Sequence, residues 1–137
     1  MRPRLATLLT FAAAALLHGW SLLRYPVLFV DEAWFASRAW GFIHTGRAFG
    51  SLDAGVIDRF EGYWTFFPWL PTVIQSVALR FAAAPTLLSV RLTALAFGFA
   101  LLVALYAIAH RLGGPWLGVI TVAIVSVSSP FFHSAHL

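Results

Sequence analysis

The carboxylates of this 137-residue chain are the side chains best suited to chemistry, and all five lie within residues 31–61. Asp31 and Glu32 form the only adjacent pair among them. A carboxylate can act as a general base, and an arginine beside it can hold a phosphate through paired hydrogen bonds. We therefore expect any reaction to be carried out in this polar stretch. Its acidic residues are Asp31, Glu32, Asp53, Asp58 and Glu61.

The residues that follow Asp31 predict a helix over 31–45, with Gly46 placed to end it. Asp31 and Arg38 then share one helical face at spacing i, i+7, so a carboxylate and a guanidinium line one pocket wall. We predict that Asp31 is a catalytic base and that Glu32 and Arg38 bind substrate. In the alternative interpretation, Asp31 only caps the helix and Glu32 only stabilises the positive end of the helix dipole.

Two further carboxylates have different expected roles. Glu61 stands just before the second apolar run, and we predict that it returns to the pocket of Asp31 and binds substrate. Its alternative is a solvated carboxylate beside the membrane. Asp53 lies in the sequence Gly-Ser-Leu-Asp-Ala-Gly, which is typical of a turn.

Three histidines are also candidate functional groups. His133 and His136 have i, i+3 spacing, which suits metal ligands or a proton relay, but four spans would place them at the inner face, opposite Asp31. A packing role is therefore expected for both. His18 lies within the first apolar run, where an interhelical hydrogen bond is the expected use.

The composition is that of a membrane protein. The chain is 61% hydrophobic and only 10% charged, against about 25% charge in soluble domains, and its mean hydropathy is +0.85. The net charge is +4, yet the basic residues are all single, scattered arginines, which argues against nucleic-acid binding. The absence of cysteine excludes disulfides, thiolate metal sites and thiol nucleophiles.

Four apolar runs predict an all-α, polytopic transmembrane helix bundle that forms a single membrane domain over residues 1–137. About 20 apolar residues are needed to cross the hydrocarbon core, and Pro85 and the Gly113-Gly114-Pro115 triplet interrupt the hydrophobic sequence between runs. Residues 24–63 form a loop between the first two spans. The predicted spans cover residues 5–23, 64–81, 87–109 and 116–132.

The orientation is predicted from the arginines beside the spans. Arg2 and Arg4 precede the first span, so the positive-inside rule places the N-terminus in the cytoplasm and the loop of residues 24–63 outside. Four spans put Arg91 inside and Arg111 outside. We expect an integral protein of the plasma (inner) membrane. A signal peptide is the alternative for the first run, but the run continues to residue 23 without a small-x-small cleavage site.

The polar stretch resembles a known class of membrane enzyme. Residues 31–40 read DEAWFASRAW, and Thr45-Gly46 closes the predicted helix. This sequence is similar to the Asp-Glu pattern that follows the first span in GT-C type membrane glycosyltransferases of the protein O-mannosyltransferase and aminoarabinose transferase branch. Residues 59–64, RFEGYW, resemble the second loop motif of that family, although Gly62-Tyr63 replaces its frequent Lys-Pro.

The resemblance implies transfer of a sugar from a polyprenyl-phosphate carrier to an acceptor at the outer membrane face. It implies that Asp31 deprotonates the acceptor and that Glu61 contacts the substrate or a divalent metal. Members of this class are much longer, so the chain is expected to be the N-terminal portion of a larger transferase. Membrane lipid and the lipid-linked donor are the implied partners.

A non-catalytic small membrane protein, such as a transporter fragment or an assembly factor, is the main alternative. A transporter is expected to place ionisable groups or broken helices near the bilayer midplane. Here all carboxylates fall outside the predicted spans, which favours chemistry at the membrane surface.

Overall fold

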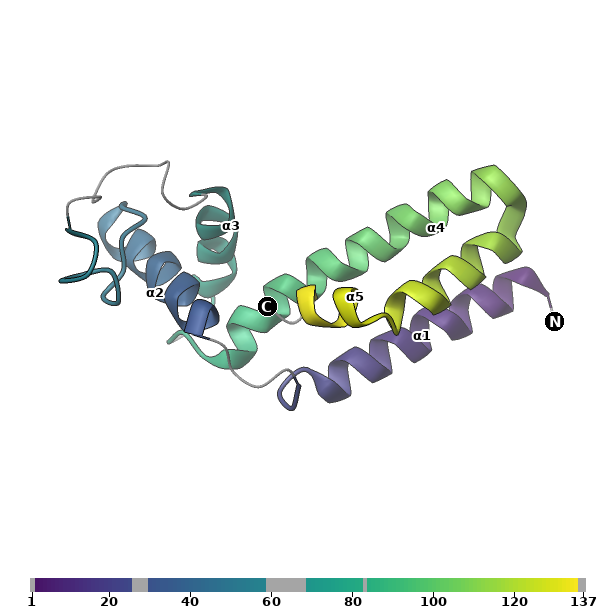
Figure 1. Ribbon diagram of the computed structural model, residues 1–137, viewed down its shortest axis with the longest axis horizontal. Helices are drawn as coiled ribbons and strands as arrows, with labels where there is room; N and C mark the ends of the chain where they lie inside the picture. The colour runs from purple at the N-terminus through teal and green to yellow at the C-terminus, as the bar shows by residue number, and fades with distance from the viewer. Residues whose placement is uncertain (1, 26–29, 59–68, 83, 136–137) are drawn as a thin grey trace. The chain divides into compact units, whose positions relative to one another are not determined.

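A computed structural model describes residues 2–25, 30–58, 69–82 and 84–135 of the chain (Figure 1). These residues form helices and turns, with no strand among them, so the predicted all-α class is confirmed. The helices are α1 (Pro3–Ser21), α2 (Val30–Thr45), α3 (Trp69–Leu79), α4 (Leu87–Ser126) and α5 (Ser129–Ser134).

The chain divides into two compact units. Unit 1 consists of Met1–Pro26 with Ala94–Leu137, and unit 2 consists of Val27–Thr93. Unit 1 therefore holds α1, most of α4 and α5, whereas unit 2 holds α2, α3 and the first residues of α4.

In unit 1, α4 consists of two helical halves joined by a sharp bend. The backbone leaves helical geometry at Gly113 and Gly114, and Pro115 begins the second half. Gly114 has φ 81 and ψ −178, a conformation that is essentially restricted to glycine. Figure 1 shows the second half running back beside the first. The Gly-Gly-Pro sequence is thus the turn of a helical hairpin, as its composition predicts.

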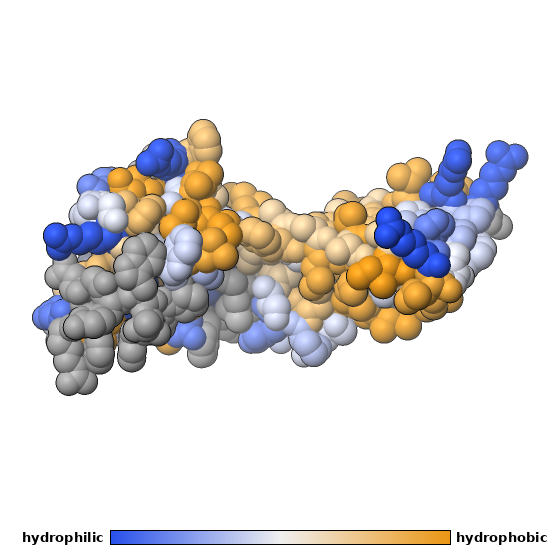
Figure 2. Space-filling view, turned by 90° about the horizontal axis from the view of Figure 1, so that it is seen from above, coloured by the Kyte–Doolittle hydropathy of each residue, from blue (hydrophilic) through white to orange (hydrophobic). Residues whose placement is uncertain are grey.

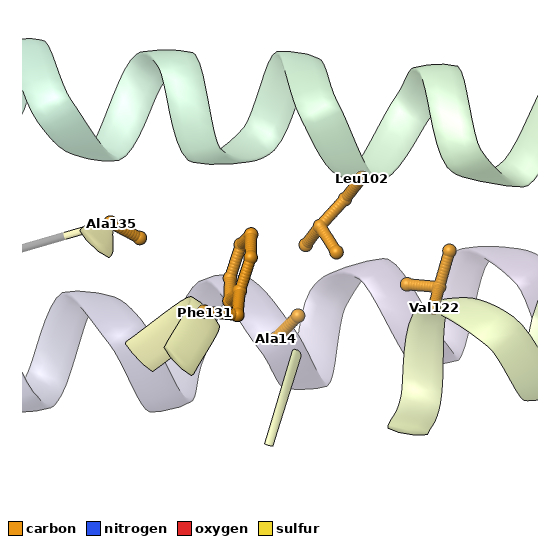
Figure 3. Close-up of a cluster of buried hydrophobic side chains, with 5 residues drawn as sticks. All are labelled: Ala14, Leu102, Val122, Phe131 and Ala135. Atoms are coloured by element: carbon orange, nitrogen blue, oxygen red, sulfur yellow. The ribbon is translucent and has the colours of Figure 1, made fainter. Parts of the chain in front are cut away.

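The core of unit 1 joins α1 to both halves of α4 and to α5. Ala14 and Leu102 meet Val122 and Phe131 in a buried apolar cluster, which Ala135 completes (Figure 3). A side chain on Gly98 would contact Ala135 at 2.8 Å, so glycine lets α5 approach α4. Helix α1 and the segment of α5 with Ala135 therefore share one apolar core with the two halves of α4.

Side-chain contacts fix which helix ends of unit 1 lie together. Thr7 Oγ1 and Tyr106 Oη are 3.0 Å apart, so the start of α1 lies beside the end of the first half of α4. Arg111 therefore shares an end of the unit with Arg2 and Arg4. The side of the membrane on which Arg111 lies stays a prediction.

The opposite end of unit 1 is defined by α5. His18 Nε2 lies 2.9 Å from the carbonyl oxygen of Ser126, and the rings of Tyr25 and Phe132 are 5.7 Å apart. The end of α1 thus meets the end of α4 and the start of α5. His133, on α5, lies at this end of unit 1.

The predicted spans are reproduced only in part. Among the described residues, only α4 is both long and apolar enough to cross a membrane. It covers the third run and part of the fourth, but the fourth run is broken after Ser126, and α5 begins at Ser129. The described part of the second run is an 11-residue helix, α3, which is shorter than a crossing requires. Residues 64–68 of that run lie outside the described residues.

The outward surface of unit 1 is apolar. Only 17% of the most hydrophobic window of α4 is buried within the described chain. The face of this unit seen in Figure 2 is largely hydrophobic, with hydrophilic side chains gathered at one end. Exposed leucines on α1 continue the apolar surface, namely Leu5, Leu8, Leu9 and Leu16.

In unit 2, α2 matches the helix predicted for residues 31–45. It ends where Gly46 adopts φ 72, and the Gly46 N–H donates to the carbonyl of Phe42 at 2.9 Å. Ala36 and Ala39 are buried on α2, and α3 packs against α2. The helix and its glycine stop confirm the local prediction.

The stability of unit 1 is expected to depend on glycine at position 114. An added Cβ on Gly114 meets nothing within 4 Å, so Gly114→Ala costs only backbone strain, about 1–3 kcal/mol. Gly19→Ala is the matched control, because Gly19 is also uncrowded but helical. It should be neutral or stabilising by about 0.5–1 kcal/mol. Thermal unfolding in detergent measures both changes, and equal stability of the two variants would contradict the requirement for glycine.

Candidate functional site

The polar residues of unit 2 are organised around the carboxylate of Asp53. Arg38 Nε lies 3.0 and 2.9 Å from the two carboxylate oxygens, and Arg38 Nη2 lies 2.6 Å from Oδ1. The Trp34 indole N–H also donates to Oδ1, and the Gly50 N–H donates to Oδ2 at 2.8 Å. Asp53 has no exposed surface and Arg38 is 4% exposed. The expected turn residue is therefore the centre of a buried network.

The network has a direct effect on the acidity of Asp53. Burial by itself raises the pKa of the Asp53 carboxyl, because the charged form loses water. The hydrogen bonds from Arg38, Gly50 and Trp34 and the charge of Arg38 together lower it more. The net pKa lies below its ordinary value of 3.8, so Asp53 is a fixed anion and not a proton acceptor near neutral pH.

Glycines bring the loop of residues 46–58 close enough to α2 to form this network. A Cβ on Gly50 would collide with Ser37, and one on Gly41 would collide with the backbone of Phe49. The Ser37 hydroxyl accepts the Leu52 N–H at 3.1 Å and holds the loop next to Asp53. The loop is thus seated on the same side of α2 as Arg38.

A second buried ion pair joins α2 to the start of α4. Arg91 Nε donates to Glu32 Oε2 at 2.9 Å, and Arg91 Nη2 donates to Oε1 at 2.8 Å. Glu32 is 2% exposed and Arg91 has no exposed surface. This two-point geometry satisfies both oxygens of the carboxylate. The prediction that Arg91 lies across the membrane from Glu32 is therefore wrong.

The predicted catalytic carboxylate, Asp31, has a different environment from its neighbour. It lies in the first turn of α2, is exposed, and makes no hydrogen bond or ion pair within the described part of the chain. Asp31 is inside the helix rather than at its cap position, because α2 begins at Val30. The Asp31-Glu32 pair thus divides into one buried structural carboxylate and one that solvent or substrate can reach.

The other predicted substrate-binding residues are not assembled around Asp31. The guanidinium of Arg38 is bound to Asp53, and the carboxylate of Glu32 is bound to Arg91, so both are engaged in holding unit 2 together. Glu61 and His136 lie outside the described residues. Asp58 accepts the Gly55 N–H at 2.8 Å in an exposed turn.

Sequence reasoning missed the partners of both ion pairs. Arg91 stands inside the apolar run that starts at Leu87, and an arginine in such a run is expected to have a partner. That signal was present, but it does not identify Glu32. Nothing in the spacing of Asp53, 15 residues after Arg38, indicates that the two meet.

The described histidines do not form a metal centre with these carboxylates. No group of three His, Asp or Glu side chains that could hold a metal ion occurs among residues 2–25, 30–58, 69–82 and 84–135. His18 is buried among the rings of Phe99, Phe131 and Phe132, and its bond to Ser126 matches the expected interhelical role.

Comparison with known proteins leaves the site to be interpreted from its own geometry. No family model, curated protein or solved structure matches the chain.

Removing the charge of Asp53 should unfold unit 2 more easily, because Arg38 would be left buried and uncompensated. We expect Asp53→Asn to cost about 3–5 kcal/mol. Asp58→Asn, which loses one exposed hydrogen bond, is the control and should cost less than about 1 kcal/mol. Chemical unfolding followed by tryptophan fluorescence measures both, and similar losses for the two variants would refute the buried network.

The lowered pKa of Asp53 predicts that unit 2 loses stability in acid. Because the folded pKa of Asp53 is below 3.8, ionised Asp53 contributes its full stabilisation above that pH. The contribution is lost as the pH falls through 3.8 towards the folded pKa. The stability difference between wild type and Asp53→Asn should therefore narrow in acid, and a difference independent of pH would contradict this linkage.

Glu32 and Arg91 should behave as a coupled pair. Glu32→Gln and Arg91→Gln each leave one buried charge and should each cost about 3–5 kcal/mol. The double variant leaves none, so its loss should fall short of the sum by up to about 3 kcal/mol. Unfolding of all four proteins completes the cycle, and strict additivity would show that the two charges do not interact.

Proposed function

We propose that this chain is the N-terminal part of an integral membrane glycosyltransferase that moves a sugar from a polyprenyl-phosphate carrier to an acceptor at the outer membrane face. The observation that carries the proposal is the exposed Asp31 carboxylate in the first turn of α2. A general base must reach the proton that it removes, and Asp31 is accessible while its neighbour Glu32 is not. The resemblance of residues 31–40 to the GT-C glycosyltransferases supplies the reaction class.

The buried pairs support this role by making α2 a rigid support. Glu32 is held at the first turn of the helix, and Arg38 is held two turns later. Both ion pairs involve residues of α2 within seven positions of Asp31. They therefore hold the first two turns of α2 in place. Catalytic groups need such positioning within fractions of an ångström. We assign Glu32 and Arg38 to positioning rather than to substrate contact.

The proposal places α4 in the membrane, because it is the helix among the described residues that is long and apolar enough to cross. Arg2 and Arg4 precede the first apolar run, so the positive-inside rule puts the N-terminus in the cytoplasm. Residues 24–63, with Asp31, are proposed to lie on the outer side.

A non-catalytic membrane protein remains the second candidate. The observation that favours it is that four of the charged groups in unit 2 are used to hold the fold together. An exposed Asp31 without catalytic function is consistent with that candidate. Activity measurements separate the two.

The test measures sugar transfer in membranes by the whole transferase that contains this chain. The donors are polyprenyl-phosphate mannose and polyprenyl-phosphate aminoarabinose. Asp31→Asn keeps the size of the side chain but removes the base, so transfer should fall by about 10²-fold or more. Asp58→Asn removes an exposed carboxylate from the same unit and should retain activity. Wild-type transfer by Asp31→Asn at normal expression would disprove its role, and absence of transfer by the wild-type protein from both donors would favour the non-catalytic candidate.

A further inference from the structure

Three arginines gather at one end of unit 1, although they come from distant parts of the sequence. Arg2 immediately precedes α1, Arg4 lies in its first turn, and Arg111 ends the first half of α4. All three are exposed. Figure 2 shows hydrophilic side chains gathered at this end of the unit, which is the end where the chain begins in Figure 1. We call these three arginines the basic end.

The hydrogen bond between Thr7 and Tyr106 sets the level of the arginines along the two helices. Its oxygens are 3.0 Å apart. Helix α1 and the first half of α4 run in opposite directions (Figure 1), so the residues before Thr7 and those after Tyr106 extend towards the same end. At 1.5 Å per residue, Arg4 lies about 5 Å beyond this hydrogen bond and Arg111 about 8 Å beyond it. The two arginines therefore start from nearly the same level on neighbouring helices.

The contacts of Tyr106 make this end a single packed structure. Its ring stacks on that of His110, with the ring centres 5.7 Å apart and an angle of 9° between the planes. It also meets the ring of Phe11 edge-on at 6.0 Å. A Cβ on Gly118 would lie 2.8 Å from the Tyr106 ring, so the second half of α4 packs on the same side chain. Helix α1 and both halves of α4 are thus joined directly beneath the basic end.

Unit 1 supplies no carboxylate side chain to neutralise the basic end. All Asp and Glu residues of the protein fall within residues 31–61, which belong to unit 2. The remaining arginine of unit 1, Arg24, lies at the other end of α1. There its Nη1 donates to the carbonyl of Trp20 at 2.6 Å, and its guanidinium lies 4.7 Å from the centre of the Trp20 ring. The positive charge of the basic end is therefore available to an anion from outside the unit.

Apolar side chains continue directly from the basic end, which favours a lipid over a free anion. Leu112, next to Arg111, is 80% exposed, and Ile108, about one turn earlier, is 57% exposed. Leu5, next to Arg4, is 51% exposed. Inorganic phosphate offers nothing apolar to these side chains. A phospholipid combines acyl chains with a phosphodiester, whose oxygens accept paired hydrogen bonds from guanidinium groups.

We infer that the basic end of unit 1 is a binding site for an anionic phospholipid. The phosphodiester lies between Arg4 and Arg111, and the acyl chains lie along the exposed apolar side chains of α1 and α4. Basic sites of this kind between membrane helices bind anionic headgroups. The inference rests on the proposed placement of α4 in the membrane, but it does not depend on transferase activity. The bound lipid neutralises the basic end and connects the start of α1 to the bend of α4.

Binding of lipids to the full chain in neutral detergent tests this inference. Native mass spectrometry compares phosphatidylglycerol with phosphatidylcholine of identical acyl chains, because the two differ in net charge. The wild-type chain should retain a single phosphatidylglycerol with a preference of about tenfold or more, since each arginine near a lipid surface contributes about fivefold. Equal retention of the two lipids would overturn the inference alone. If neither lipid is retained, the proposed membrane placement fails with it.

Matched arginine variants locate the charge that selects the lipid. Arg111→Gln should lower the preference for phosphatidylglycerol about fivefold, and Arg4→Gln with Arg111→Gln should lower it roughly 30-fold. Arg24→Gln removes the same charge from the opposite end of α1 and should leave the preference unchanged. Circular dichroism checks that each variant keeps its helices. Equal losses for Arg111→Gln and Arg24→Gln would show that only net charge matters, and the site would have to be withdrawn.

Soluble competitors separate a lipid site from a general anion site. The probes are inorganic phosphate and glycerophosphoglycerol, which is the headgroup of phosphatidylglycerol without its acyl chains. Neither should displace the lipid at equal concentration, because neither contacts the apolar side chains beside the arginines. Displacement by inorganic phosphate at equal concentration would indicate a free-anion site and would exclude the lipid assignment.

Fluorescence in phosphatidylcholine vesicles places the lipid on the protein. The chain has no cysteine, so Leu112→Cys and Leu23→Cys can each carry one fluorophore. Both positions are exposed and adjacent to an arginine, but they lie at opposite ends of unit 1. Spin-labelled phosphatidylglycerol should quench the label at position 112 more than spin-labelled phosphatidylcholine does, whereas the two lipids should quench the label at position 23 equally. The same ratio at both positions would contradict a site at the basic end.

Discussion

The ion pair between Glu32 and Arg91 is the constraint on which the organisation of unit 2 depends. It connects the first turn of α2 to the first turns of α4 across 59 residues of sequence, and both side chains are almost completely buried. Such a pair gains stability only when geometry and hydrogen bonding are complete, since each ion has given up its hydration. The chain between Glu32 and Arg91 must therefore bring Arg91 back to the first turn of α2.

Asp53 and Arg38 repeat the same arrangement over a shorter distance, and together the two pairs explain how so hydrophobic a chain maintains a polar unit. Arg38 seats the loop on α2, while Arg91 seats the start of α4 beside it. The four charged side chains of these pairs are buried because each is neutralised by its partner, and they hold the parts of unit 2 together. Asp31 takes no part in either pair, and its side chain is exposed.

Local features were predictable from the sequence, and long-range pairings were not. The helix of residues 31–45 and its glycine stop depend on neighbouring residues, as does the bend at Gly113-Gly114, so the sequence contains their causes. The four predicted spans are not supported, because only α4 among the described residues is a helix long and apolar enough to cross a membrane. The position of Arg91 within an apolar run was the signal against four spans, but its partner is specified only by the folded chain.

The separation of Glu32 from Arg91 also has a consequence for synthesis. A growing chain exposes Glu32 well before Arg91, which is 59 residues further along the chain. During that interval the carboxylate must stay hydrated, because burial without its partner is too costly. Unit 2 therefore cannot complete its interior until the first residues of α4 have left the ribosome. Folding of unit 2 is in this way coupled in time to synthesis of the start of α4.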